Sequence, residues 1–115
     1  MNFIVEKREG FAVITMTTER LDAHSVPELR SELVLLAGDS VKNMILDLTQ
    51  CAYCDTTGLS AILIAHRLCK EGMLILSGVH QSVENMLSIQ RFDPPLIVTS
   101  SVADGIARLQ RVEKE

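Results

Sequence analysis

Three short apolar runs constrain the fold of this 115-residue chain more than any other feature of its sequence. They cover residues 44–48, 73–76 and 96–98, and none is long enough for a buried helix. Apolar runs of this length are typical of strands that are buried on both faces of a sheet. The segments between them place apolar residues at helical spacing. Strands that alternate with helices predict parallel pairing, because a parallel pair needs a long crossover connection.

The first third of the chain predicts a hairpin followed by a helix. Residues 3–5 and 11–17 have the composition of two strands joined by a short turn. Ser25 and Glu28 have the spacing of a capping box, with Pro27 in the first helical turn. This pattern predicts that the Ser25 side chain binds a free N–H group of the first turn.

Later apolar spacing predicts a short third helix around residues 83–87 and a last helix that begins after Ser101. The sequence therefore predicts one α/β domain over residues 1–115. Its mixed sheet should begin with the hairpin and continue with parallel strands, and about four helices should cover it.

The second helix is expected to follow Asp55 and to end near Gly72. At about 100° per residue, its core face is small and apolar and consists of Gly58, Ala61, Ile62, Ala65, Leu68 and Cys69. The opposite side carries Thr56, Ser60, Leu63, Arg67 and Lys70, with Leu59 and Ile64 at its flanks. A regular helix would therefore turn Thr56 outward and leave Thr57 nearer the core boundary.

Two features of this helix suggest a function. Thr56 stands at a helix N-terminus, where free N–H groups and the helix dipole favour a negative charge such as a phosphoryl group. Leu59, Leu63 and Ile64 would form an apolar ridge on a face expected to be wet, which is typical of a docking surface. The alternative is that Asp55 and Thr56 are ordinary caps and that another part of the fold covers the ridge.

The stretch Asp-Thr-Thr-Gly-Leu at 55–59, between an apolar strand and an apolar helix, resembles the Asp-Ser-Ser-Gly-Leu signature of STAS domains. The chain is most similar to the bacterial anti-sigma factor antagonists of that family. Leu21-Asp22-Ala23-His24, before the first helix, resembles the family's entry to that helix. The order of the remaining strands and helices also matches over nearly the whole chain.

The resemblance implies a partner switch. The unmodified protein would bind an anti-sigma factor that is also a serine/threonine kinase, and so release a sigma factor. Phosphorylation of Thr56 would end binding, and a serine/threonine phosphatase would reset the switch. The acceptor is a threonine where the best-known antagonists have serine. Thr57 is the second candidate acceptor, since the next residue is also a threonine. The partner-binding residues expected from the motif and the helical wheel are Asp22, Asp55, Gly58, Leu59, Ser60, Leu63, Ile64 and Arg67.

A second reading within the same family stays open. Some STAS domains are scaffold subunits of transporters or of stress-signalling assemblies and are never phosphorylated. The two hypotheses differ in the expected effect of Thr56→Asp. The variant should weaken partner binding if the protein is a switch and leave binding nearly unchanged if it is a scaffold.

Charge and composition argue against several other classes of protein. The chain has 11 basic and 15 acidic residues and only 3% aromatic residues, so a basic face with stacking aromatics for nucleic acid is not expected. No apolar run is long enough to insert in a membrane, and early charge argues against a signal peptide. The expected location is therefore the cytoplasm. Nothing in the sequence indicates a homo-oligomer.

Catalytic and metal chemistry are also not indicated. Cys51 and Cys54 have the spacing of a redox pair, but Asp55 would oppose a thiolate there, and we expect two small buried hydrophobes. A zinc site would need His66 and Cys69 as further ligands, at spacings unlike those of closed zinc sites. Nucleotide-binding glycine motifs and a nucleophile elbow are absent. We expect no enzyme activity, no cofactor and no metal.

Overall fold

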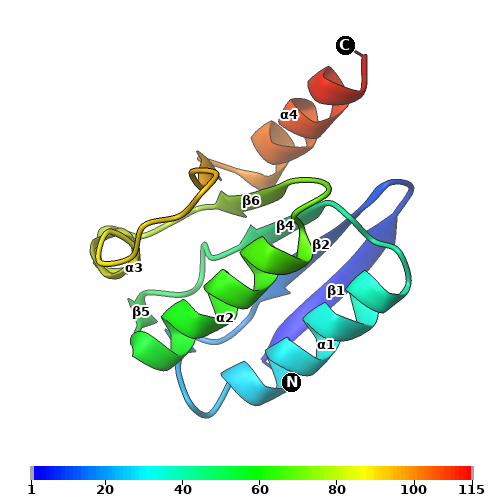
Figure 1. The fold of residues 1–115 in the computed structure, drawn as a ribbon. Coiled ribbons are helices and arrows are strands. Elements are labelled where there is room, and N and C mark those ends of the chain that lie inside the picture. Colours follow the sequence, from blue (N-terminus) through cyan, green and yellow to red (C-terminus); the bar gives the residue numbers. More distant parts are fainter. Residues whose placement is uncertain (1, 115) are drawn as a thin grey trace.

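The computed structural model describes residues 2–114, which form a five-stranded sheet, a two-stranded sheet and four helices (Figure 1). The strand order in the larger sheet is β1-β2-β4-β6-β7, and these strands are Phe3–Arg8, Phe11–Met16, Met44–Asp47, Leu74–Ser77 and Ile97–Thr99. Strands β1 and β2 form an antiparallel hairpin, and each later neighbour pairs in parallel. The prediction of a mixed sheet that starts with a hairpin is confirmed.

The helices cover both faces of the larger sheet. They are α1 (Val26–Gly38), α2 (Thr56–Leu68), α3 (Gln81–Leu87) and α4 (Val102–Lys114). Helices α1 and α2 lie side by side across one face, and α4 packs against the opposite face (Figure 1). Each helix follows a strand, so α1, α2 and α3 serve as the crossovers that parallel pairing requires.

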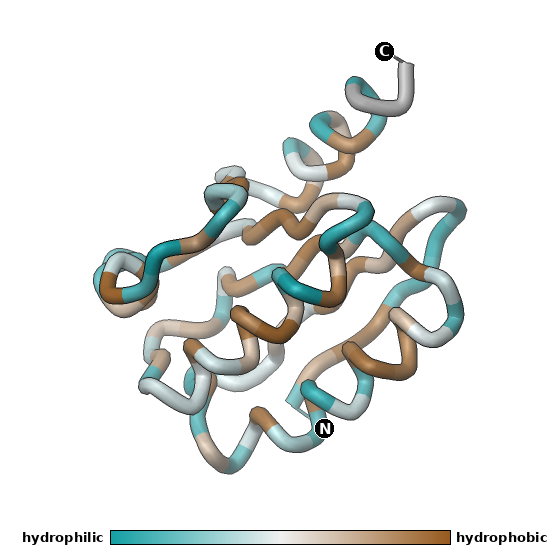
Figure 2. Tube along the Cα trace, viewed as in Figure 1, coloured by the Kyte–Doolittle hydropathy of each residue, from teal (hydrophilic) through white to brown (hydrophobic). Residues whose placement is uncertain are grey.

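Alternation along the strands divides the core into two clusters. Ile14 and Leu46 belong to the larger cluster, beneath α1 and α2. Their neighbours Val13 and Ile45 point the other way and pack with Leu109 of α4. Figure 2 shows hydrophobic residues concentrated in these central strands. Since both faces of the strands are buried, their apolar runs are continuous instead of alternating.

The predicted capping box at the start of α1 is wrong. The Ser25 side chain caps no helical N–H group. Its hydroxyl donates to the carbonyl of Arg20 at 2.9 Å and accepts the N–H of Asp22 at 3.1 Å. The Asp22 carbonyl in turn accepts the N–H groups of Ser25 and Val26. The buried Ser25 hydroxyl therefore fixes the loop before α1, because it bonds two backbone groups of that loop at once.

Helix α2 ends earlier than predicted. Its last helical residue is Leu68, and the N–H of Gly72 then donates to the carbonyl of Cys69 at 2.9 Å in a turn. A Cβ atom at Gly72 would collide with the carbonyl oxygen of Lys42. The chain thus passes close to another backbone segment here, and a further helical turn would not allow that approach.

Two very short strands were not predicted. Strand β3 is Arg20–Leu21 and strand β5 is Tyr53–Cys54, and they pair in parallel as the smaller sheet. Two residues show no alternation that a sequence pattern could reveal.

Candidate partner-binding site

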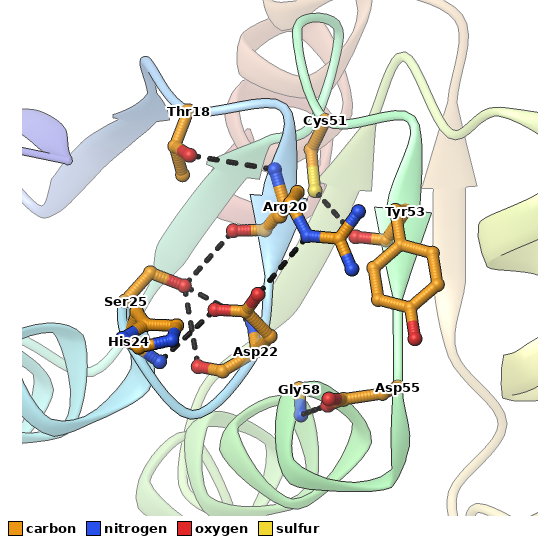
Figure 3. Close-up of polar contacts among 9 residues, drawn as sticks. All are labelled: Thr18, Arg20, Asp22, His24, Ser25, Cys51, Tyr53, Asp55 and Gly58. Carbon is orange, nitrogen blue, oxygen red and sulfur yellow. Dashed lines mark hydrogen bonds and ion pairs between the residues drawn. The ribbon is translucent and has the colours of Figure 1, made fainter.

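The β3–β5 pair joins the loop before α1 to the loop before α2. Leu21 lies opposite Cys54, and the N–H of Asp55 donates to the Leu21 carbonyl at 3.3 Å. Asp22 follows β3 and Asp55 follows β5, so the pairing brings these two carboxylates to one edge of the molecule (Figure 3). The resemblance names both among the expected partner-binding residues, and the backbone pairing explains how they come to the same edge.

Asp55 is the N-cap of α2, as the capping alternative predicted. Its backbone is extended, and its Oδ1 accepts the N–H of Gly58 at 2.9 Å (Figure 3). Gly58 itself is buried against β3. A Cβ atom at Gly58 would collide with the carbonyl oxygen of Leu21 and lie 2.8 Å from the Cys54 sulfur. The start of α2 is therefore held closely against the β3–β5 pair.

The two threonines at this helix start differ in exposure. Thr56 is the first residue of α2 and is exposed, whereas Thr57 is half-buried. Among the groups that the structure describes, which exclude the side chains of residues 112–115, the Thr56 hydroxyl has no hydrogen-bond partner, and the capping role falls to Asp55. The carbonyl of Thr57 accepts a bond from the Ser60 hydroxyl. The predicted orientation of both threonines is confirmed, and phosphorylation of either stays a prediction.

Asp22 is held as a carboxylate by its neighbours. Its Oδ1 accepts the N–H of His24 at 3.0 Å, and its Oδ2 accepts the Arg20 Nε at 3.2 Å. The His24 N–H bond, followed by the bond to Arg20, lowers the pKa of Asp22 below its ordinary value, although desolvation opposes the shift. A negative charge therefore stands beside the start of α2 at neutral pH.

Arg20 and Tyr53 complete this surface, and the sequence analysis missed both. The Arg20 guanidinium lies 4.0 Å from the centre of the Tyr53 ring, which is a cation–π contact between two exposed side chains. Arg20 stands two residues before Asp22, and Tyr53 stands two before Asp55. That spacing is a signal only when the β3–β5 pairing, which puts Arg20 opposite Tyr53, is already known.

The predicted apolar ridge on α2 is only partly present. Leu59 is 7% exposed and belongs to the larger core cluster, so the expectation that it lies on the wet face is wrong. The cause is tertiary, because α3, β3 and β5 all contact the helix that carries it. Ser60, Leu63 and Ile64 are half-buried, and Arg67 is exposed near the far end of α2. The accessible part of the predicted ridge is therefore confined to Leu63 and Ile64.

Cys51 and Cys54 are buried thiols. Burial is the main cause that raises the pKa of Cys54 to about 12, with smaller contributions from the neighbouring Cys51 and the Asp55 carboxylate. Burial also raises the pKa of Cys51, whose thiol donates to the Tyr53 carbonyl at 3.3 Å. A nucleophilic thiolate is therefore disfavoured at both positions. Their contribution is to packing.

In the part of the chain that the structure describes, no group of three or more His, Cys, Asp or Glu side chains is close enough together to hold a metal ion. No helix there combines the length and the apolar character needed to cross a bilayer.

Solved structures similar to this chain share its whole fold. SpoIIAA, an anti-sigma factor antagonist in its unphosphorylated form, superposes with a TM-score of 0.77 at 19% identity, over 94% of this chain and 97% of that chain. A variant of RsbS from Moorella thermoacetica superposes with a TM-score of 0.84 at 18% identity, over 100% of both chains. A murine anion transporter of the solute carrier 26 family matches with a TM-score of 0.74 at 17% identity, over 92% of this chain but only 18% of the transporter.

At these identities the structural matches show the fold alone. No curated protein sequence matches the chain significantly. The family profile described as "STAS domain" matches residues 2–105, which is most of the chain and includes the β3–β5 pair and the Asp55–Leu59 motif. This match, together with the shared architecture, shows that the chain belongs to the STAS domain family.

Proposed function

We propose that this protein is an anti-sigma factor antagonist, and that Thr56 is the residue whose phosphorylation switches partner binding. The observation that carries the proposal is the exposed Thr56 hydroxyl at the capped N-terminus of α2, which has no hydrogen-bond partner among the described groups. The whole chain, residues 1–115, acts as one STAS domain in the cytoplasm. It binds an anti-sigma factor kinase and has no catalytic chemistry of its own.

Electrostatics explains how a phosphate at Thr56 would change binding. The group adds about 1.5–2 negative charges at pH 7. The free N–H groups of the first helical turn stabilise an anion there, so phosphorylation does not require the helix to refold. Asp22 already contributes a negative charge to this edge, and its lowered pKa keeps it ionised. An acidic group on the partner would then face a strongly negative surface and dissociate.

The expected partner surface combines this edge with the neighbouring face of α2. Asp22, Asp55, Thr56 and Ser60 supply polar contacts, and Leu63 and Ile64 supply the apolar ones. Gly58 and Leu59 contribute from beneath, because both are buried and hold the helix start in place. Arg67 lies about 16 Å from Thr56 along the helix axis, so it belongs to the partner surface only if the partner spans the whole helix.

A constitutive scaffold is the second candidate function. It is favoured by the structural match to part of a much larger transporter, in which the matching segment is a small fraction of the chain. Such a scaffold would bind its assembly whether or not Thr56 carries a charge.

The experiment compares matched variants in capture of a kinase. The wild-type protein and the variants Thr56→Asp, Thr56→Val and Thr57→Asp are immobilised and exposed to lysate of cells that express the protein. Captured proteins are identified by mass spectrometry, and each captured kinase is tested for phosphorylation of the wild-type chain. We expect wild type, Thr56→Val and Thr57→Asp to retain a kinase that modifies Thr56, and Thr56→Asp to lose it.

Three other outcomes would each have a definite meaning. Loss of the kinase from Thr57→Asp alone, with phosphate on Thr57, would keep the switch and move its acceptor by one residue. Equal capture by all four proteins would favour the scaffold. Phosphopeptide analysis that finds a bare 51–65 segment in growing and in stressed cells would remove phosphorylation from the proposal.

A further inference from the structure

A cavity lies at the end of α2 that is opposite to Thr56. Its volume is about 380 Å³, within the range of small-molecule sites. The last turn of α2, the start of β6 and the segment before β7 form its walls. The helix separates this cavity from the Thr56 hydroxyl by about 16 Å. Arg67 is the one expected partner-binding residue that also lines the cavity.

The cavity has a fixed wall. The Nε2–H of His66, on α2, donates to the Pro94 carbonyl at 2.8 Å, since a carbonyl oxygen can only accept. The same imidazole meets the Phe92 ring edge-on, with 5.4 Å between the ring centres. These two contacts hold the segment before β7 against the helix. A ligand would therefore find the cavity already formed, without having to order a loop.

The lining has an apolar floor and a basic rim. Met73, Leu74 and Ile97 provide the floor. Arg67 and Lys70 stand on the rim, and neither has an ion-pair partner among the side chains of residues 2–111, which the structure describes. The end of a helix attracts cations, which explains why two basic residues are tolerated side by side.

The balance of charge around the cavity differs from that of the chain. Asp93 also lines the cavity, so the two rim cations face one carboxylate. The lining is thus locally positive in a chain whose net charge is −4. Within the described residues, neither Arg67 nor Lys70 is bonded to a carboxylate that could neutralise its charge.

We propose that this cavity binds a small amphipathic carboxylate, with its apolar tail on Met73, Leu74 and Ile97 and its carboxylate against Arg67 and Lys70. The tail would be removed from water on the apolar floor, which supplies most of the binding free energy. The carboxylate would form charge-assisted hydrogen bonds with the rim. An apolar molecule without the charge, or a carboxylate without the tail, uses only half of the site.

Octanoate is the probe for this site. We expect saturable binding in a titration followed by amide NMR shifts, with the largest shifts in residues 66–74 and 92–97. Acetate lacks the tail and octanol lacks the charge, so both should bind at least about tenfold more weakly. The double variant Arg67→Gln/Lys70→Gln should weaken octanoate by a similar factor. Arg30→Gln, which removes an exposed charge from α1, should not.

The comparison of ligands also contains the results that would overturn the proposal. Octanol that binds as tightly as octanoate would make the site merely apolar. Unchanged affinity in the double variant would remove the basic rim from recognition. Shifts that cluster around Asp22 and Thr56 would place the ligand elsewhere. Because no kinase takes part in the titration, its result does not depend on the proposed switch.

Discussion

The two ends of α2 are fixed in different ways, although each passes close to another part of the backbone. At the N-terminal end, Gly58 is pressed against the Leu21 carbonyl, and the Asp55 side chain caps the helix. At the C-terminal end, Gly72 is pressed against the Lys42 carbonyl after the helix has ended. Within the described part of the chain no side chain caps that end, and His66 instead bonds a distant segment that also lines the cavity.

This difference separates two kinds of site on one helix. At the N-terminal end, backbone pairing and a cap leave little space, and this end of the helix is a surface with an exposed hydroxyl. At the C-terminal end, side-chain contacts leave space, and a cavity forms there. A protein partner needs the first arrangement, and a small molecule needs the second.

The largest effect is expected from the buried thiols that flank the two ends. Burial is the main cause that raises the pKa of Cys54 and of Cys69 from 9.0 to about 12. Between these values the unfolded chain loses protons that the folded chain keeps, so stability should fall as pH rises from 9 toward 12. Urea unfolding at neutral pH and at about pH 11, with reductant present, measures this loss. Cys54→Ala and Cys69→Ala should each make it smaller; an unchanged loss in both would contradict the assignment.

Gly58→Ala should have the next largest effect, because it breaks the close contact at the N-terminal end. The added Cβ must displace the Leu21 carbonyl or the helix start, at a cost of about 1–3 kcal/mol. Gly38→Ala in α1 is the matched control, since a Cβ there meets nothing within 4 Å. The control should be neutral or stabilising by up to about 1 kcal/mol. Equal free energies of unfolding for the two variants would show that the backbone at the N-terminal end can shift to accommodate the added Cβ atom.

Arg20→Gln should have the smallest effect on stability and should sharpen the comparison. It removes the cation–π contact with Tyr53, which is worth about 0.5–1 kcal/mol at an exposed site. It also removes one of the bonds that lower the pKa of Asp22, so that pKa should rise toward its ordinary value. An NMR titration of Asp22 measures the change, with Arg30→Gln as the control. An unmoved pKa would mean that the His24 N–H bond alone sets it.

Much of this architecture could be predicted because it depends on local pattern. The apolar runs predicted the central strands, and the helical spacing correctly identified the core face of α2 from Gly58 to Ala65. The exposure of Thr56 also followed from its angle on the helix. These properties depend on residues within one or two turns of each other.

The errors concern residues whose neighbours come from distant parts of the chain. Leu59 is buried because elements on either side of α2 in the sequence close over it, which a helical wheel does not represent. Ser25 met all the sequence criteria for a cap, but Asp22 and Arg20 offered its hydroxyl other partners. The bond between His66 and Pro94 joins residues far apart, so the wall of the cavity had no sequence signal.

The β3–β5 pair has a further consequence for the order in which the molecule folds. Its two strands are separated by α1 and β4, so the pair can form only after that whole intervening segment has closed into a loop. Closing such a loop costs entropy that only native contacts elsewhere can offset. Asp22 and Asp55 therefore become neighbours only once that loop has closed. A partner that requires both carboxylates would recognise finished copies of the protein and ignore chains that are still folding.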